Sequence, residues 1–585
     1  MITLKKFYFE PTFNDIQPIE FSTGLNFIIG EESEKNENQI EAKKMNGVGK
    51  SMLIEMINFC LFKDLKNSRV DRIPSAVLSP QIFLCLELEI ETDKSLKALT
   101  IKRSTSEKNN VFVFDAQEEK EFEKAEDAKE YVEDLIFRDS AIKERPSLRS
   151  LLSLAIRDER TSYNNILYPY TESAKGYFGD AIKPHLYFFD FDLALVDKIK
   201  SFDKKLDSIT EVMKALRDDI RQENVDPKDI EVYLNELRDR VEKLDFSIKK
   251  LQPGEAVLQT QQELKNLEEE IRRLVSEKVA REYVVRQIKS LPRVEKVNSA
   301  EIKAIYNQFK KGLGDLVNKS FEEVQAFQLE VQAFQNGLMT EKLQDLNKEI
   351  NELEIRIDEL DEKIAKIYSK TTAPERIEEL KSAIIIFREK NSELDKLSSA
   401  YNMLTTKKGE HKRIMRERQA AIEALDAQLI GLSIKIESFR KDLEQIHEFI
   451  AGNKAYHFQI EVNEKGKEFI NFDYRIKLDG SSGINRIKTF IYDVLLMLNT
   501  YTSKRHLGFL IHDNIFASVG KDDMSRALNY LNAASLKKPK FQYIVTINKD
   551  EFDSSVKDFD FDYRKKVRAT FTREAPFLRQ EYREI

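Results

Sequence analysis

The chain has 585 residues, of which 34% are charged, with 13 prolines, no tryptophan and two cysteines. This composition predicts much long helix, and Cys60 and Cys85 exclude a disulfide framework and fit a reducing compartment. No run approaches the roughly 18 apolar residues of a membrane span, and the N-terminus lacks the pattern of a signal peptide. We therefore expect a cytoplasmic protein, and the net charge of −7 argues against a uniformly basic nucleic-acid binder.

A phosphate-binding loop is predicted near the N-terminus. Residues 24–30 have the pattern of a short buried strand ending at Gly30, and Asn46-Gly47-Val48-Gly49-Lys50-Ser51 leads into a helix with apolar residues at helical spacing. A strand, a glycine-rich turn and a helix N-terminus form a cradle of backbone N–H groups for phosphate. Lys50 would reach the β- and γ-phosphates of a nucleotide, and the Ser51 hydroxyl would bind Mg²⁺. Taken alone, the motif has a chance glycine turn as its alternative interpretation.

The loop departs from the usual spacing of this motif. Lys44 stands where Gly-x-x-x-x-Gly-Lys-Ser has its first glycine, and the glycine at the strand end is instead Gly30. We interpret the polar and acidic residues 31–44 as an insertion within the loop. A lid or a sensor is a conceivable role for this insertion, but no residue in it indicates one.

The middle of the chain has the pattern of a coiled coil. From about residue 202 to residue 450, apolar residues keep a 3-4 heptad spacing among Glu, Lys, Asp and Arg. Two apolar residues in seven predict a narrow two-stranded seam and not a globular core. The seams cover residues 202–220, 230–251, 346–367 and 422–446.

Helix breakers predict that this coiled coil folds back on itself. Gly312-Leu313-Gly314 lies near its middle, and Pro253-Gly254 and residues 371–374 lie at nearly equal distances on either side. This arrangement is typical of an antiparallel hairpin with an elbow. An arm of about 120 residues would reach on the order of 180 Å at 1.5 Å per residue, and less if the elbow bends.

A hairpin returns the chain to its start, so we expect the two chain ends to form one domain. The expected parts are residues 1–190, the first half of this domain; 191–315, the outgoing arm with a break near 253; 316–452, the returning arm with a break near 374; and 453–585, the second half of the domain.

The C-terminal part contains two further candidate elements. Residues 506–513 have the pattern of a buried strand ending in Asp513, which suits a Mg²⁺-holding carboxylate opposite a phosphate loop. An ordinary core strand that ends at a surface aspartate is the alternative. Residues 479–485, with Ser482 and Gly483, form a Ser/Gly turn before a helix and predict a second phosphate site, which need not serve the same nucleotide. A surface loop would have a similar sequence.

The order of phosphate loop, long hairpin, Ser-Gly turn and acidic strand end resembles the ABC-type ATPase heads of the SMC, RecF and RecN group. The resemblance implies an α/β ABC-type ATPase head assembled from both chain ends, with a long antiparallel coiled-coil hairpin between them. It also implies ATP and Mg²⁺ sandwiched between two heads of a dimer, with Ser482-Gly483 as the signature motif that completes the partner's site.

The same resemblance implies further site residues. Residues 153–160 occupy the place of the Q-loop but contain no glutamine there, so Asp158 or Glu159 would contact Mg²⁺ or water. The strand at 543–547 ends at Asn548, where such heads usually carry a histidine. Asn548 is therefore a candidate nucleotide-binding residue.

The split phosphate loop, the His512-Asp513 pair and the Ile547-Asn548 ending are similar to the ATPases of Lamassu-type three-component bacterial defence systems. This resemblance implies an SMC-like DNA sensor that works with an accessory subunit and an effector, often a nuclease, encoded by other genes. The alternatives are an SMC-like ATPase of DNA repair or recombination and a nucleotide-binding coiled-coil tether with little turnover. We find no nuclease-like acidic cluster outside the head, so an effector would be another polypeptide.

One substitution bears on the mechanism. SMC-type heads follow the strand-end aspartate with a glutamate that polarises the attacking water, whereas here Asn514 follows Asp513. Asparagine can position a water but cannot accept its proton, and general-base help is worth roughly 10²–10⁴ in rate. We therefore expect slow hydrolysis, unless His512, Asp522 or Asp523 has taken over.

Two basic clusters are candidate DNA contacts. Lys412, Arg413 and Arg416 lie on the returning arm, and Lys565 and Lys566 lie near the C-terminus. Such clusters would bind phosphates without reading bases, and the binding would depend strongly on salt. Solvated helix faces balanced by nearby acidic residues are the alternative.

Overall fold

The computed structural model describes all residues except 32–47, 66–67, 80, 93–94, 105–109, 116–117, 139–143, 159–162, 164–177, 252–257, 291–320, 372–373, 465, 478–480, 539, 581 and 583–585. The chain forms two compact units. The α/β unit comprises Met1–Lys200 and Gln419–Ile585, and the helical unit comprises Ser201–Arg418.

A five-stranded parallel sheet forms the centre of the α/β unit. Its order is β13 (Val567–Phe571), β3 (Gly24–Gly30), β12 (Gln542–Asn548), β11 (Phe509–Asp513) and β8 (Ile156–Arg157). Every neighbouring pair is parallel, and the sheet combines β3 and β8 from the N-terminal part of the chain with β11, β12 and β13 from the C-terminal part. All residues of β3 and β11 are buried, as expected for parallel strands covered on both faces.

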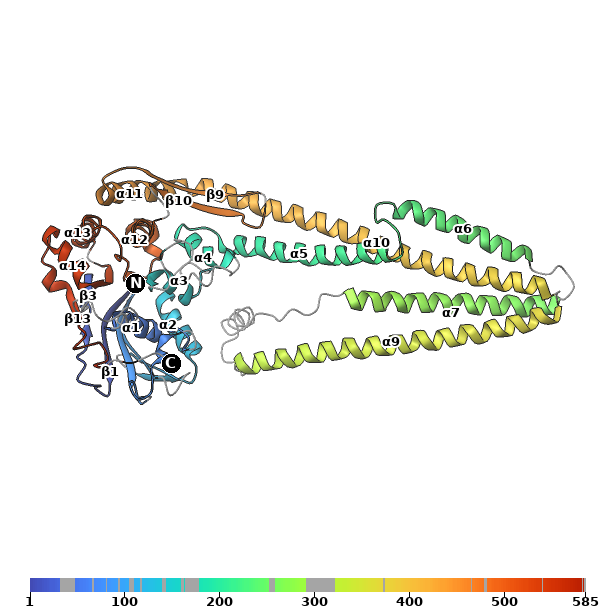
Figure 1. Ribbon diagram of the computed structural model, residues 1–585, viewed down its shortest axis with the longest axis horizontal. Helices are drawn as coiled ribbons and strands as arrows, with labels where there is room; N and C mark the ends of the chain where they lie inside the picture. Colours follow the sequence, from blue (N-terminus) through green and yellow to red (C-terminus); the bar gives the residue numbers. More distant parts are fainter. Residues whose placement is uncertain are drawn as a thin grey trace, which may run out of the picture. The chain divides into compact units, whose positions relative to one another are not determined.

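Helices from both parts of the chain pack on this sheet (Figure 1). In α1 (Lys50–Cys60) every residue except Ser51 is buried, and α12 (Ser482–Leu498) is buried from Thr489 onward. The helices α3 (Leu148–Ala155), α13 (Lys521–Lys537) and α14 (Lys549–Ser555) also contact the sheet, and α4 (Phe178–Phe188) packs against α3.

The α/β unit contains two further sheets. An antiparallel six-stranded sheet has the order β2 (Ile19–Glu20), β1 (Ile2–Glu10), β4 (Phe83–Glu91), β5 (Leu96–Ser104), β6 (Val111–Asp115) and β7 (Glu119–Phe122), with α2 (Ala125–Phe137) packed on it. The hairpin of β9 (Tyr456–Val462) and β10 (Ile470–Ile476) packs against α11 (Ser433–Ala451) through Phe458 and Phe439, whose ring centroids are 5.2 Å apart.

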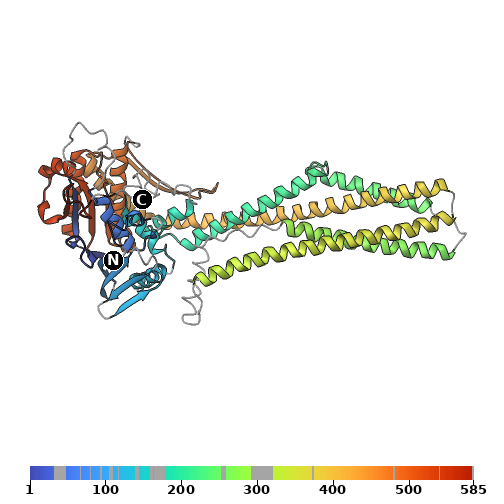
Figure 2. The same ribbon diagram turned by 60° about the horizontal axis from the view of Figure 1, so that its bottom comes forward.

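Long helices make up the helical unit. They are α5 (Leu193–Gln222), α6 (Ile230–Leu251), α7 (Leu258–Ser290), α9 (Phe321–Thr371) and α10 (Pro374–Gly431), of which α5 begins and α10 ends in the α/β unit. Arg281 contacts Glu349 at 2.6 Å, and Lys278 contacts Glu354 at 2.6 Å. Residue numbers rise along α9 as they fall along α7, so these two helices are antiparallel and lie side by side (Figure 1 and Figure 2).

The helical unit folds back at its elbow. Asp245 of α6 lies 3.5 Å from Arg272 of α7, and Asp361 of α9 forms an ion pair with Arg388 of α10. One hydrophobic cluster joins all four helices, with Ile248, Leu274, Leu360, Leu380 and Ile384 among its members. The helical unit is therefore bent at its elbow, because one helix pair packs against the other.

Helix ends lie next to the expected breaks, whereas the expected tip is not described. α6 ends at Leu251, α9 ends at Thr371 and α10 begins at Pro374. Pro253-Gly254 and Gly312-Leu313-Gly314 lie outside the described residues. None of the described helices is long and apolar enough to cross a membrane.

Candidate nucleotide-binding site

Three strand ends meet at one edge of the parallel sheet. In the strand order β3, β12, β11, Gly30 pairs with Asn548, and Thr546 pairs with Asp513. The carboxyl edge of a parallel sheet is where ligands bind in open α/β folds. The structure thus brings Gly30, Asn548 and Asp513 together from positions far apart in the sequence.

The turn before α1 has a backbone that a ligand can approach closely. Gly49 caps this helix with a φ of +94°, a left-handed conformation that side-chain-bearing residues rarely adopt. No side chain caps the helix N-terminus, whose N–H groups carry a partial positive charge. Val48 and Ser51 flank this turn, while Asn46 and Gly47 lie outside the described residues.

Lys50 lies along the end of β3 and reaches the end of β12. It is 8% exposed, and a Cβ at Gly30 would stand 2.5 Å from its Cδ. Its Nζ donates a hydrogen bond to Oδ1 of Asn548. The glycine at position 30 therefore leaves the space in which the lysine side chain passes, and Asn548 lies within reach of its ammonium group.

Asp513 is held in a defined orientation at the end of β11. It is 1% exposed, and its Oδ1 accepts a 2.6 Å hydrogen bond from Oγ1 of Thr546. The same Oγ1 accepts a 2.8 Å bond from the backbone N of Asn514. The hydroxyl of Tyr163 donates to the backbone oxygen of Asp513 at 2.6 Å. Burial raises the pKa of Tyr163 well above its ordinary value, with the charge of Asp513 as the next cause, so the phenol stays a donor.

Asn514 adopts a left-handed backbone conformation, with a φ of 57°. Its backbone oxygen accepts a hydrogen bond from Arg486 of α12. Asparagine tolerates this conformation better than most residues, whereas glutamate does not share that tolerance. Asparagine at this position therefore suits the backbone conformation, in addition to the role in positioning a water molecule that the sequence predicts.

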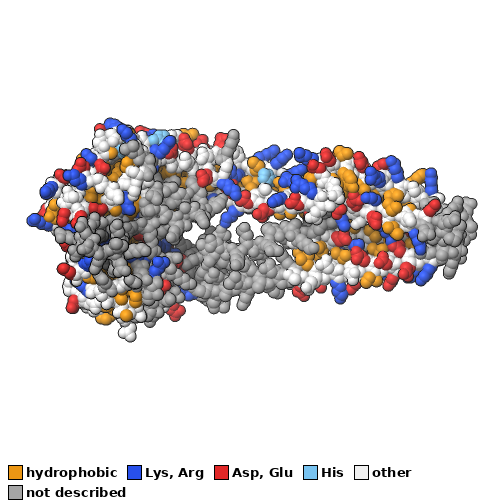
Figure 3. Space-filling view, viewed as in Figure 1, with side chains coloured by type: hydrophobic (Ala, Val, Ile, Leu, Met, Phe, Trp, Pro, Cys, Tyr) orange, Lys and Arg blue, Asp and Glu red, His pale blue; other side chains and the backbone are white. Residues whose placement is uncertain are grey.

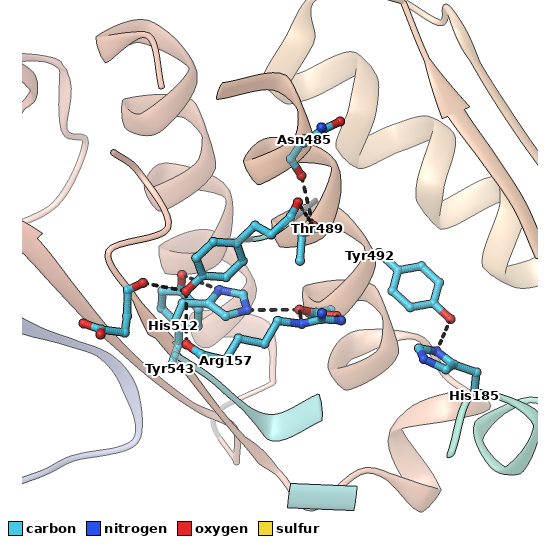
Figure 4. Close-up of polar contacts among 10 residues, drawn as sticks. Arg157, His185, Asn485, Thr489, Tyr492, His512 and Tyr543 are labelled. Carbon is cyan, nitrogen blue, oxygen red and sulfur yellow. Dashed lines mark hydrogen bonds and ion pairs between the residues drawn. The ribbon is translucent and has the colours of Figure 1, made fainter. Parts of the chain in front are cut away.

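His512 lies on the opposite side of β11 from Asp513, because successive strand residues point to opposite faces. It is fully buried, with Nε2 3.1 Å from Asp493 and Nδ1 3.1 Å from the hydroxyl of Tyr543 (Figure 4). Burial lowers the pKa of His512, so the ring is neutral, donates to Asp493 and accepts from Tyr543. Both ring nitrogens of His512 are thus engaged by other side chains, and the catalytic role expected for His512 stays a prediction.

A buried ion pair completes this support. Arg157 of β8 forms an ion pair with Asp493 of α12, in which Nη2 donates a 2.8 Å hydrogen bond to Oδ1 and Nε lies 2.5 Å from Oδ2. Although burial alone would raise the pKa of Asp493, Arg157 and His512 hold it below its ordinary value. The network therefore connects α12 to the strands beneath the candidate site.

The Ser-Gly turn leads directly into α12. Ser481 is the N-cap, with its Oγ accepting from the backbone N of Ile484 at 3.4 Å, and Ser482 is exposed. A Cβ on Gly483 would stand 2.3 Å from the backbone oxygen of Ser518. Glycine is therefore required there, because α12 packs against the segment that follows β11.

The remaining candidate residues have other surroundings. Asp158 is buried with one carboxylate oxygen 3.7 Å from Nζ of Lys63, and Glu159 lies outside the described residues. Asp522 and Asp523 lie in the first turn of α13, and Asp523 pairs with Arg526 at 3.0 Å.

The basic clusters differ in exposure. Lys412, Arg413 and Arg416 are exposed on α10, with Arg413 3.9 Å from Glu417. Figure 3 shows acidic and basic side chains interspersed along the helical unit. In the α/β unit, Lys565 lies 3.8 Å from Asp562, while burial lowers the pKa of the half-buried Lys566.

Among the described residues, no group of three or more His, Cys, Asp or Glu could hold a metal ion by itself. Mg²⁺ is usually held by one or two carboxylates together with substrate phosphates. A hydroxyl at Ser51 and a buried carboxylate at Asp513 fit that mode of binding. They do not fit a metal site made by the protein alone.

Several supporting residues were missed in the sequence. Thr546 lies within the apolar run 543–547 of β12, and Asp493 lies within the apolar run of α12. A polar residue within a buried element predicts a specific hydrogen-bonded partner, and this signal could have identified both. Tyr163 and Arg486 carry no comparable signal.

Comparisons with known proteins give one similarity across most of the chain and one within its C-terminal part. The chain is 23% identical over 576 residues to the "Uncharacterized protein YydD" of Bacillus subtilis (strain 168), covering 91% of this chain and 90% of that protein. Residues 446–575 match a family described as "Uncharacterised protein conserved in bacteria (DUF2326)".

Among solved structures, the chain is similar to the Smc head domain with a coiled coil and joint from Pyrococcus yayanosii, with 13% identity and a TM-score of 0.35. The match covers 96% of this chain and 94% of that chain. Because a TM-score of 0.35 does not establish a shared fold, we assign the fold from strand order and register alone.

Proposed function

We propose that this protein is an SMC-like ATPase that binds Mg²⁺-ATP at the carboxyl edge of its parallel sheet. One observation carries the proposal. A glycine-capped helix N-terminus with Lys50 follows β3, and Asp513 ends β11, with Asn548 between them at the end of β12. A helix N-terminus suited to phosphate and a carboxylate suited to Mg²⁺ thus follow strands that are separated only by β12, an arrangement that supports nucleotide hydrolysis.

Each residue of the site has a role in this proposal. The backbone at Val48 and Gly49 cradles phosphate, Lys50 neutralises its charge, and Asn548 lies beside the lysine. Ser51 and Asp513 hold Mg²⁺, which supplies charge neutralisation at the phosphates when bound. Asn46 and Gly47 belong to the same loop by sequence, and Asp158 and Glu159 are additional candidates for contact with Mg²⁺ or water.

The proposal includes a head-to-head dimer. Ser482 is exposed at the N-terminus of α12, next to Gly483, and this turn would complete the phosphate site of a second copy. ATP would then be bound between two α/β units. Nucleotide binding would thereby control assembly.

The proposal includes DNA because of exposed basic side chains, and partner proteins because of the resemblance of the motifs. Lys412, Arg413 and Arg416 would bind DNA phosphates, with Lys565 and Lys566 as a second candidate surface. By the resemblance of its motifs to Lamassu-type ATPases, the protein would sense DNA in the cytoplasm and control an effector through an accessory subunit. The neighbouring genes test this role, since an adjacent nuclease-like gene supports defence and an isolated locus supports DNA repair.

A second candidate function is a nucleotide-binding tether with little turnover. The observation that favours it is Asn514, which cannot accept a proton and stands in a left-handed conformation suited to asparagine. Both functions share the same nucleotide site. They differ in whether bound ATP is hydrolysed.

Nucleotide binding is tested with Lys50→Ala. At a concentration of Mg²⁺-ATP about 100 times its Kd, the wild type should gain about 2.7 kcal/mol of stability, seen as a raised Tm. Lys50→Ala should keep its helical circular dichroism and lose this gain, because the phosphate charge loses its partner. Lys540→Ala, at an exposed lysine paired with Glu91, is the matched control. An equal gain in Lys50→Ala and the wild type would contradict the assignment.

A further inference from the structure

The interrupted phosphate loop has its two ends fixed by the same C-terminal segment. The loop runs from Glu31 to Val48, with residues 32–47 between them. A longer loop carries a larger entropic cost of holding its ends at a defined separation. The contacts at each end therefore bear on how well the loop is prepared for phosphate. We call residues 571–580 the C-terminal strap.

The strap contacts the start of the loop. β13 pairs in parallel with β3 and places Phe571 opposite Gly30. Beyond the strand pair, the backbone oxygen of Phe571 accepts a 2.8 Å hydrogen bond from the backbone N of Glu31. The chain therefore leaves β3 while still bonded to the strap.

The strap also contacts the end of the loop. The backbone N of Phe577 donates a 2.9 Å hydrogen bond to the backbone oxygen of Val48. A Cβ on Gly49 would stand only 2.5 Å from Cβ of Phe577, so the two segments are in tight contact. The turn that presents the N-terminus of α1 is thus packed against the strap immediately before Lys50.

Contacts outside the loop anchor the strap. Phe577 is 1% exposed, and its ring centroid lies 5.9 Å from that of Phe9 and 6.3 Å from that of Phe7, both on β1. The side chain of Asn14 donates to the backbone oxygen of Leu578 at 3.3 Å. Gln580 donates to the backbone oxygen of Val77 at 3.0 Å. The strap is therefore held by the six-stranded sheet and its neighbours, independently of the loop.

We propose that the C-terminal strap positions the phosphate loop, with Phe577 as a positioning residue that sets nucleotide affinity without touching the nucleotide. This inference rests on the proposed function. Its physical basis is preorganisation, because contacts with the strap hold Glu31 and the Val48–Gly49 turn in place before phosphate arrives. A merely structural role for Phe577 would lower stability and leave the affinity of the folded protein unchanged.

The test compares Phe577→Ala with Phe458→Ala in the full chain. Phe458 is also a buried phenylalanine of the α/β unit, but it packs in the β9–α11 layer away from the loop. Both variants should have a lower Tm. Titration with a fluorescent ATP analogue and Mg²⁺ should show affinity weakened by about tenfold or more in Phe577→Ala and unchanged in Phe458→Ala. Phe577→Leu, which keeps a buried apolar side chain, should recover most of the affinity.

Two further measurements keep the inference falsifiable. Gln580→Ala removes one anchoring hydrogen bond and should weaken affinity by about threefold; it provides the test if Phe577→Ala does not fold. Hydrogen exchange at residues 48–52 needs no nucleotide and should be faster in Phe577→Ala than in Phe458→Ala.

The outcomes separate the two proposals. Analogue binding that does not depend on Lys50 overturns the nucleotide site itself. Binding that depends on Lys50 but is unchanged in Phe577→Ala, or in Gln580→Ala where the first variant does not fold, overturns the role of the strap. Equal hydrogen exchange in Phe577→Ala and Phe458→Ala also overturns it.

Discussion

Replacing Asn514 by glutamate tests whether this residue lies where the attacking water is polarised. Asn514→Glu supplies a carboxylate that can accept a proton, which the amide cannot do. Asn514→Gln is the matched control, because it has the same length and the same backbone requirement but no charge. The ratio of the two hydrolysis rates therefore isolates the carboxylate.

The expected magnitude combines two effects. Both variants place a longer side chain at a backbone φ of 57°, which costs roughly 1–2 kcal/mol for a residue without the local tolerance of asparagine. This strain acts on stability and applies equally to both. General-base help is worth roughly 10²–10⁴ in rate, so Asn514→Glu should hydrolyse ATP at least about 100 times faster than Asn514→Gln.

The assay is steady-state phosphate release with Mg²⁺-ATP, with Lys50→Ala as the background. The wild type should turn over well below the ~10 s⁻¹ typical of enzymes. If Asn514→Glu and Asn514→Gln hydrolyse ATP at the same rate while both still bind it, Asn514 does not adjoin the water. Substitution of His512, Asp522 or Asp523 should then abolish turnover, since these are the remaining candidates.

Three other predictions concern assembly, the buried ion pair and pH. Ser482→Arg should block ATP-driven association of two copies, measured by light scattering, and should leave ATP binding to the monomer intact; association in that variant would contradict the dimer. Arg157→Met should lower the free energy of unfolding by about 3–5 kcal/mol, because it leaves the carboxylate of Asp493 buried without its cation. The double variant Arg157→Met with Asp493→Leu should recover part of the loss in thermal melts, since the buried ring of His512 then lacks its acceptor. Burial lowers the pKa of His506 to about 4, and its Nδ1 accepts a hydrogen bond from the backbone N of Gly508. As the pH falls below 6.5, His506 therefore takes up a proton in the unfolded state before it does so in the folded state. The free energy of unfolding should be highest above pH 6.5 and decrease as the pH falls. That loss should be about 2 kcal/mol between pH 6.5 and pH 5 and smaller in His506→Gln, and an identical pH dependence in both proteins would show that His506 is not responsible.

Local sequence was informative where a short pattern determines its own structure. A buried strand, a glycine turn and an apolar helical period placed Lys50 at the start of α1, and the apolar run at 506–513 placed Asp513 at the end of β11. The heptad spacing likewise identified the long helices between residues 193 and 451. These features depend on neighbours within a few residues, so periodicity and turn residues suffice to predict them.

The surroundings of His512 could not be read from the sequence, because they depend on strand alternation and burial. His512 stood next to Asp513 in the chain and looked available for catalysis, but the strand turns it to the opposite face. There it meets Asp493 and Tyr543, which lie on other elements. The face of the sheet on which His512 lies could be assigned only from the packing of α12 against β11.

By itself the sequence determined the motifs, their order and the helical middle of this protein. Only the tertiary structure decided which distant residues meet, such as Lys50 with Asn548, Arg157 with Asp493 and Phe577 with Val48. It also decided that the helical unit folds back at its elbow, because that reversal depends on the hydrophobic cluster shared by four helices. Such contacts arise from the burial of surfaces far apart in the chain, and no local pattern specifies which buried surfaces come together.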